Sequence, residues 1–171
     1  LVKVAKSKNE ISVSRLAEKN AKQSLKQKLI QSDTNNNLIE KLASKFDLNS
    51  NIDLIEVYDN SHIQGTDSIG ALISFSNEGF VKKRYRKFNI KDEKVKNDDY
   101  GMMKEVLFRR FSKAIKEKSG SLSLPDLILI DGGKGQYSVS REVLNELGLH
   151  DLPILAVAKG KKRNAGEEKI Y

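Results

Sequence analysis

Apolar residues recur at helical spacing near the start of this chain, separated by lysine, glutamate and glutamine, which are good helix formers. We expect a helix over residues 14–31, capped by Ser14, and a second short amphipathic helix over 38–46. The polar run 33–37 predicts a break between them. We interpret residues 1–50 as a helical lead-in that packs as scaffold, since it contains no constellation of ligand-binding residues.

After the lead-in, the hydrophobic period shortens to two. The β-branched segment Ile52–Tyr58 predicts a strand that stops at the polar sequence DNSH. Ile69–Phe75 alternates cleanly, and the turn sequence SNEG leads into a second hairpin strand predicted over Phe80–Ile90. We therefore expect an antiparallel meander of three strands.

The last part of the chain predicts two helices, each followed by a strand. The first helix opens at Asp98–Asp99 and ends near Lys118, and capping is the default role for two aspartates in a first turn. The strand Leu127–Ile130, the helix Gln136–Leu147 and the strand Pro153–Ala158 follow.

The predicted order is β-β-β-α-β-α-β. Helical crossovers should add the last two strands parallel to the first, which gives a mixed five-stranded sheet flanked by helices. This order matches the α/β ribonuclease H-like fold, which we expect over residues 51–171.

Composition narrows the class of function. The chain carries 31 Lys and Arg against 23 Asp and Glu, a net charge of +8, which favours a polyanionic partner such as nucleic acid. It contains no cysteine, which removes disulfide and thiol chemistry and fits a reducing cytoplasm. No apolar run approaches the roughly 20 residues that span a bilayer, so we expect a soluble protein with no membrane partner.

The segment Pro125–Gln136, PDLILIDGGKGQ, combines a buried strand with a polar turn. Asp131 ends the strand, and Lys134 stands in a glycine-rich loop that could approach a ligand closely. A metal or phosphate site is one interpretation. The alternative is a tight strand-to-helix turn whose aspartate caps the next helix. The glycines of this loop are Gly132, Gly133 and Gly135.

A second aspartate, Asp59, follows the first predicted strand. If that strand lies parallel to and beside the strand ending at Asp131, the two carboxylates emerge at the same sheet edge, about 5 Å apart in strand spacing. Two carboxylates this close repel unless a cation lies between them, and hard oxygen ligands favour Mg²⁺ or Mn²⁺. Such ions can activate water for phosphodiester cleavage.

Basic residues stand in two places that could contact the phosphates of a nucleic acid. Arg84 and Arg86 stand among aromatic residues in the predicted edge strand, where the alternative role is protection of the edge against aggregation. Lys134 and Lys159 follow strands in glycine loops at the edge where the acids should lie, so they could hold the DNA backbone.

Several ordered motifs together carry a specific resemblance from about residue 14 onward. The chain resembles the C-terminal endonuclease region of UvrC, the incising component of the excinuclease in bacterial nucleotide excision repair. The resemblance implies a ribonuclease H-like nuclease that makes the 5′ incision beside a DNA lesion with a divalent metal, and that cooperates with UvrA and UvrB. The motifs are YDNSHIQG, YRKFNI, NDDYGMM, LFRRF, PDLILIDGGKGQ and VAKG.

By this resemblance, Asp59 and Asp131 are the two metal-binding carboxylates, and Asp99 is similar to a family aspartate needed for incision. Asp99 at a helix start could orient a water, neutralise a neighbour or simply cap. His62 is close enough to Asp59 to act around the metal, although a structural hydrogen-bonding role is the alternative. We expect His150 to lie at the surface.

The family site also uses a histidine on a helix downstream of the VAKG motif, and neither His62 nor His150 occupies that position. We therefore expect this chain to be a central fragment, C-terminally truncated in its endonuclease domain. We expect it to bind metal and DNA weakly and to have little incision activity alone.

Two other functions remain open from the residues. One is a non-catalytic basic module that binds nucleic acid and uses its aspartates as caps. The other treats GGKGQ as a nucleotide-phosphate loop at a helix start, but the GxxxxGK[ST] spacing is missing.

Overall fold

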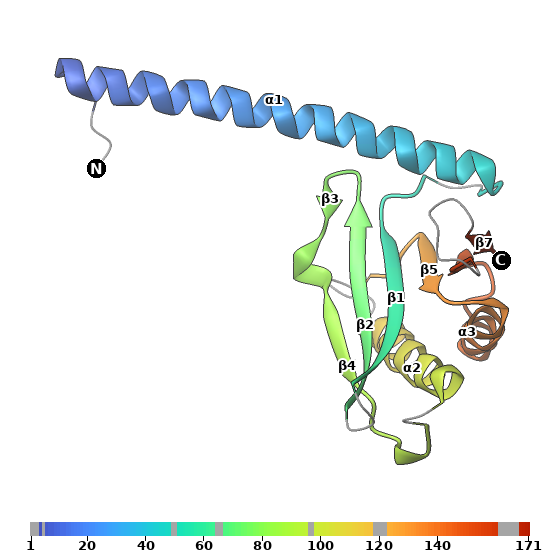
Figure 1. The fold of residues 1–171 in the computed structure, drawn as a ribbon. Helices are drawn as coiled ribbons and strands as arrows, with labels where there is room; N and C mark the ends of the chain where they lie inside the picture. The colour runs from blue at the N-terminus through green and yellow to red at the C-terminus, as the bar shows by residue number, and fades with distance from the viewer. Residues whose placement is uncertain are drawn as a thin grey trace.

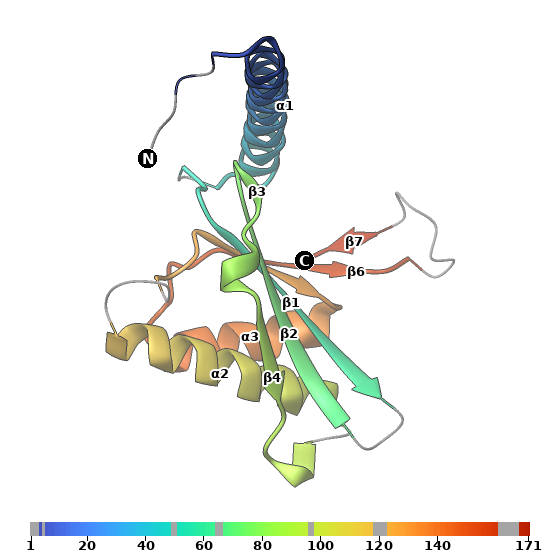
Figure 2. The ribbon, with the colours of Figure 1, turned by 90° about the vertical axis from the view of Figure 1, so that its left-hand side faces the viewer.

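The structure, a computed structural model, describes residues 4, 6–48, 51–63, 67–95, 98–117, 123–160 and 168–171. A mixed sheet forms the centre of the molecule (Figure 1). Figure 2 shows helices α2 (Asp99–Glu117) and α3 (Lys134–Glu146) packed together on one face of this sheet. Helix α1 (Lys8–Lys45) crosses one end of the sheet and extends away from it.

Strand β1 (Ile55–Ile63) is central to the sheet. It pairs antiparallel with β2 (Asp67–Ser76) on one side and parallel with β5 (Leu127–Asp131) on the other. Strand β6 (Ile154–Ala158) lies parallel to β5. The antiparallel pairing of the early strands and the helical crossovers to parallel strands were both predicted from the order of the elements.

Strand β1 was predicted to stop before Asp59, and this prediction is wrong. It continues to Ile63 because β2 remains hydrogen-bonded to it from Asp59↔Ala71 to Ile63↔Asp67. Only the parallel partner ends early, since β5 pairs with β1 no further than Tyr58. The polar sequence DNSH is therefore a strand that lacks a neighbour on one side.

The predicted strand Phe80–Ile90 is interrupted. It consists of β3 (Gly79–Phe80), a 3₁₀ turn, η1 (Lys82–Arg84), and β4 (Arg86–Asn89), and both strands pair with β2. The Arg84 N–H donates to the Val81 carbonyl at 2.9 Å, which is a local bond in place of a ladder bond. The interruption turns the Arg84 side chain inward, a tertiary effect that the alternating pattern does not reveal.

The sheet gains one further strand at its other edge. β7 (Lys169–Ile170) pairs antiparallel with β6, and no strand was predicted there. With the divided edge strand, the described residues form seven strands in place of the predicted five. Two residues are too few for an alternating pattern to be recognised. A short 3₁₀ turn, η2 (Glu93–Val95), precedes α2.

The two faces of β5 belong to different hydrophobic clusters. Ile128 and Ile130 face α2 and α3 in the larger cluster, together with Tyr58 and Phe111. Residues of the opposite parity face the other way, where Leu127 packs with Ile39, Ile52 and Ile55. Because side chains alternate along a strand, Asp131 and Asp59 project from this second, less covered face.

Helix α1 is continuous, so the predicted break at 33–37 is wrong. Asn35, in the middle of that polar run, is 4% exposed and donates from Nδ2 to the Asn77 carbonyl at 2.9 Å. The cap is Ser7, with a capping box to Glu10, and Ser14 lies inside the helix. Among the described residues, no helix is both long and apolar enough to cross a membrane.

A buried charged network lies between β1 and α2. Glu56, 1% exposed, accepts from Arg110 Nη2 at 2.7 Å and from Arg84 Nη2 at 3.4 Å. The Tyr58 hydroxyl donates to Glu56 Oε2 at 2.6 Å. Burial, and then the Glu56 charge, raises the pKa of Tyr58 well above its ordinary value, so that hydroxyl stays protonated. Both arginines also donate to the Ser123 carbonyl at 2.9 Å.

We predict that Glu56→Gln destabilises the fold by about 3 kcal/mol at pH 7, because it leaves the buried Arg110 and the partly buried Arg84 without their carboxylate. Urea unfolding measures the change. The matched control is Glu146→Gln, which removes an exposed ion pair to Lys104 and should cost less than about 1 kcal/mol. Equal effects in both variants would contradict the structural role of the network.

Candidate active site

Asp59 and Asp131 are brought together by the parallel ladder between β1 and β5. Tyr58 pairs with Ile130, so the next residue on each strand is an aspartate. Both project from the sheet face opposite α2 and α3. Parallel strands lie about 4.8 Å apart, which places the two carboxylates within direct electrostatic reach of one another.

The pKa of Asp59 is shifted by its neighbours in this site. Partial burial, followed by the Asp131 charge, raises the pKa of Asp59, while Lys159 opposes the shift. The Lys159 ammonium donates to Asp131 Oδ2 at 3.0 Å, and its side chain remains 66% exposed. A cationic side chain therefore neutralises part of the acidic pair.

Asp99 contributes a third, weaker effect. Its charge also raises the pKa of Asp59, which indicates that the start of α2 lies near the acidic pair. Asn60 Nδ2 donates to the Asp99 carbonyl at 3.2 Å and so ties this helix end to β1. The capping predicted for the aspartate pair belongs to Asp98, whose Oδ1 accepts from the Tyr100 N–H at 3.0 Å.

The glycine loop after Asp131 serves close packing. A Cβ on Gly135 would lie 2.4 Å from the Tyr100 hydroxyl, so the first turn of α3 approaches the first turn of α2 closely. Gly133 N–H donates to Gln136 Oε1 at 3.0 Å. That amide is already bonded within the loop, which argues against a nucleotide-phosphate loop here.

Comparison with known proteins identifies the family. The model described as the UvrC RNase H endonuclease domain matches residues 43–171. The chain belongs to this family. The ribonuclease H-like fold and the assignment to an endonuclease domain of the UvrC excinuclease component, both expected from the sequence, are confirmed.

Curated relatives of this UvrC domain carry the name UvrABC system protein C. The protein of Cereibacter sphaeroides is 49% identical over 158 residues, and that of Hyphomonas neptunium is 50% identical over 160 residues. Each match covers 91% of this chain but only 25% and 26% of the relatives. The chain thus spans about a quarter of their length.

Among solved structures, endonuclease V of Ciona intestinalis, in complex with a DNA containing inosine, is similar to this chain. The TM-score is 0.43 at 18% identity, and the match covers 86% of this chain and 58% of that one. Human endonuclease V has a TM-score of 0.42 at 16% identity, with 63% of this chain and 46% of that chain covered.

The donor chemistry of the UvrC domain suits a hard divalent cation. Asp59 and Asp131 supply carboxylate oxygens, and a lysine ammonium already lies against one of them as a cation would. Within the part of the chain that the structure describes, however, no group of three or more His, Cys, Asp or Glu side chains is placed to hold a metal ion. Two carboxylates are thus the protein ligands that these residues offer.

The other predicted site residues have mixed outcomes. Lys134 is the exposed first residue of α3, and Arg86 is exposed on β4, where its Nη1 donates to the Lys83 and Tyr85 carbonyls. Arg84 was also predicted to contact nucleic acid. Its side chain is only 15% exposed and is paired with Glu56, so it is not placed to contact DNA.

His62 was predicted to act around the metal or to make a structural hydrogen bond, and His150 was predicted to lie at the surface. His62 is a residue of β1, but its side chain lies outside the described part of the structure. His150 is exposed, as expected, and its Nδ1 lies 3.3 Å from Asn145 Oδ1.

Sequence reasoning missed Asn60 as a positioning residue. It adjoins Asp59, yet its role arises from a bond to Asp99, 39 residues away, which no local pattern reveals. Its Oδ1 is buried and has no hydrogen-bond partner among the described residues. Pairing of Lys159 with Asp131 was likewise not predicted, although both were placed at the same sheet edge.

We predict opposite shifts of the Asp59 pKa in two variants of the metal-free protein. Asp131→Asn removes a neighbouring negative charge and should lower it, whereas Lys159→Gln removes a positive charge and should raise it further. Carboxyl ¹³C NMR titration measures both. Shifts of the same sign would contradict the arrangement of these three charges.

The raised pKa also predicts a stability change with a defined sign. The folded state binds the Asp59 proton more tightly than the unfolded state does. Ionisation of Asp59 therefore destabilises the fold as the pH rises from the ordinary pKa of an aspartate through the raised pKa of Asp59. Asp59→Asn should therefore raise the Tm of the metal-free chain at pH 7, and the gain should shrink as pH falls toward about 4. Thermal unfolding followed by circular dichroism measures both values, and a lower Tm at pH 7 would contradict the prediction.

Proposed function

We propose that this domain cleaves a phosphodiester bond of DNA in a divalent-metal-dependent reaction and makes the 5′ incision beside a lesion. The observation that supports the proposal best is the pair of aspartates on adjacent parallel strands, where partial burial and then the Asp131 charge raise the pKa of Asp59. A fold that places two like charges together at a cost in stability gains from a cation that binds between them.

In this proposal Asp59 and Asp131 hold Mg²⁺ or Mn²⁺. When bound, the ion would supply a Lewis acid that polarises the phosphate and lowers the pKa of water. Asp99, at the start of α2 near Asp59, would orient the attacking water by accepting a hydrogen bond from it. Asn60 holds that helix end against β1 and so keeps Asp99 beside the pair.

Three exposed basic residues around the acids suit the phosphates of the substrate strand. Lys159 reaches the acidic pair on a side chain that is 66% exposed, so it can contact a phosphate oxygen beside the scissile bond. Lys134 lies at the start of α3, directly after the loop that follows Asp131. Arg86, on the β4 edge, is the more distant contact.

The names of the relatives support a role in the UvrABC system. They are components of the UvrABC system, and we propose that this domain acts on damaged double-stranded DNA together with UvrB, after UvrA. The absence of cysteine accords with the bacterial cytoplasm.

The Lys159–Asp131 ion pair favours a second candidate, a non-catalytic nucleic-acid-binding module. In that case the lysine is a permanent neutralising partner of Asp131, and the basic surface holds DNA without cleaving it. Metal binding separates the two functions, because only the nuclease requires a cation to replace the ammonium group at Asp131.

We predict that Asp59→Asn and Asp131→Asn each weaken Mn²⁺ binding by more than about 100-fold, since loss of a ligand should exceed the 10- to 100-fold effect typical of residues behind the ligands. Electron paramagnetic resonance of free Mn²⁺ measures binding, and nicking of supercoiled plasmid measures the residual activity. Asp151→Asn, at an exposed turn, is the matched control. Unchanged Mn²⁺ affinity in both site variants would contradict the metal-dependent nuclease and favour the non-catalytic nucleic-acid-binding module.

A further inference from the structure

Among the described residues, the first two thirds of α1 pack against no other element, apart from the neighbourhood of Glu78 at the end of this stretch. Every residue from 8 to 31 is exposed, and the segment extends beyond the sheet in Figure 1. At a rise of about 1.5 Å per residue, this stretch is about 36 Å long. Isolated helices are marginal in water, so a solvent-exposed helix of this length favours a surface that another molecule covers.

One side of this stretch is basic. At about 100° per residue, five cationic residues fall within an arc of about 60° and extend over about 27 Å of the helix. We name these residues the basic ridge: Lys8, Arg15, Lys19, Lys22 and Lys26.

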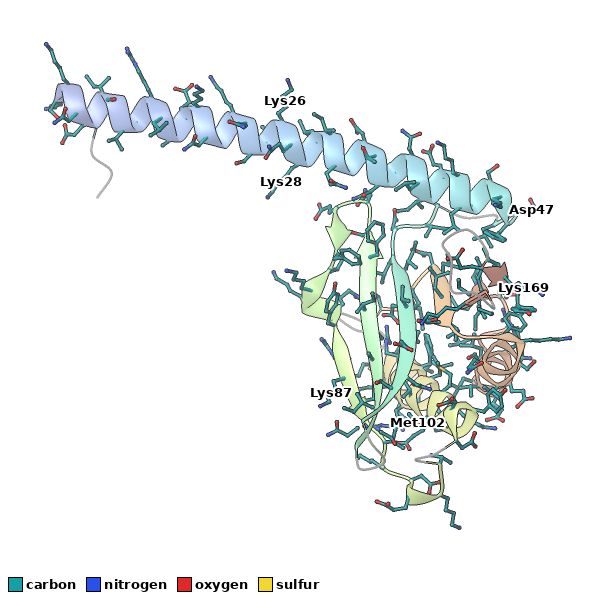
Figure 3. The ribbon with its side chains drawn as sticks, in the orientation of Figure 1. Lys26, Lys28, Asp47, Lys87, Met102 and Lys169 are labelled. Atoms are coloured by element: carbon teal, nitrogen blue, oxygen red, sulfur yellow. The ribbon has the colours of Figure 1, made fainter. Side chains whose placement is uncertain are left out.

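The basic ridge faces away from the domain. Figure 3 shows Lys26 pointing away from the sheet, whereas Lys28 points toward the side on which the sheet lies. Further along α1, the buried residues Asn35 and Ile39 lie on the side opposite the ridge. The ridge charges are therefore available to a second molecule and play no part in packing α1 onto the sheet.

Acidic residues do little to neutralise the ridge. Glu10 is used at the helix start, where its Oε2 accepts from the Lys6 and Ser7 N–H groups at 3.0 and 2.9 Å. Glu18 forms one exposed pair with Lys22 at 2.6 Å. In residues 8–31 six basic side chains thus stand against two acidic ones.

Exposed apolar side chains of the same stretch do not form a single stripe. Val13 and Leu16, 67% and 58% exposed, lie on the opposite side of the helix from Ile11 and Leu29. A helix that docks onto a protein groove or pairs with a second copy presents its apolar residues on one face. Charge is therefore the organised feature of this surface.

We infer that the basic ridge binds the phosphate backbone of duplex DNA, outside the position of the acidic pair. A length of about 27 Å covers about eight phosphates of one strand at 3.4 Å of axial spacing, enough for each of the five side chains to reach one. Binding of this kind reads no sequence, which suits a protein whose substrate is defined by damage. This inference rests on the proposed action on DNA.

The test compares two variants of the 171-residue chain with equal loss of charge. In the ridge variant, all five residues of the basic ridge become Gln, which preserves helix propensity. In the control variant, five exposed lysines elsewhere become Gln: Lys28, Lys41, Lys45, Lys113 and Lys116. Fluorescence anisotropy with an undamaged duplex of about 30 base pairs measures affinity between about 50 and 200 mM salt. Circular dichroism checks helix content.

We expect the ridge variant to lose more than about tenfold in affinity, and the slope of log K against log salt to fall in magnitude by about 3 or more. The control variant should lose less than about threefold. Equal losses in the two variants, or none in the ridge variant, would overturn the inference. So would vesicles of anionic lipid that displace the duplex from the wild-type chain at equal phosphate concentration.

Two further variants separate this inference from the proposed nuclease. Replacing the four ridge lysines with Arg keeps both the charge and the helix propensity, so duplex affinity should stay within about twofold. Asp131→Asn should remove Mn²⁺ binding yet leave the ridge-dependent part of duplex affinity intact. If the chain binds no Mn²⁺ but loses duplex affinity in the ridge variant, the nuclease proposal fails and the ridge inference stands.

Discussion

The parallel pairing of β1 with β5 is the constraint on which the candidate site depends. Its register places Tyr58 opposite Ile130, so the residue after each is an aspartate on the same face of the sheet. A slip of one residue would send one carboxylate into the cluster formed with α2 and α3. The apolar residues of β5, buried on alternating faces, oppose such a slip because Ile128 and Ile130 fit only one side.

Contacts from surrounding elements keep the Asp59 and Asp131 carboxylates close together despite their mutual repulsion. The network of Glu56 with Arg110 and Arg84 fastens β1 to α2 and to the turn before β4. Asn60 fixes the start of α2 against the same strand. Lys159 offsets part of the repulsion from the far side of β5. Partial burial and then the Asp131 charge raise the pKa of Asp59, and shifted pKa values of this kind are common at functional sites.

The long helix separates two tasks within one element. Its C-terminal part contributes Ile39 to the smaller hydrophobic cluster and Asn35 to the turn between β2 and β3. Its N-terminal part carries the basic ridge on the side away from the sheet. DNA contact along the ridge and chemistry at the acidic pair would thus be served by different surfaces of one domain.

Local pattern alone was enough to predict the helices α2 and α3, the parallel strands and the two aspartates, because each depends on periodicity and on connections that are short in sequence. The motifs of the chain likewise identified its family. Other features needed contacts between residues distant in sequence. A polar run stays helical because Asn35 bonds to Asn77, and β1 continues through its polar residues because β2 pairs with them.

The roles of single side chains also came only from tertiary structure. Arg84 and Arg86 look alike in sequence, yet one is buried against Glu56 and the other is exposed, since a 3₁₀ turn reverses the direction of the first. The choice of capping residue between Asp98 and Asp99 likewise depended on where α2 meets β1. The sequence by itself determined which chemical groups the site would contain, and long-range packing decided which of them face one another.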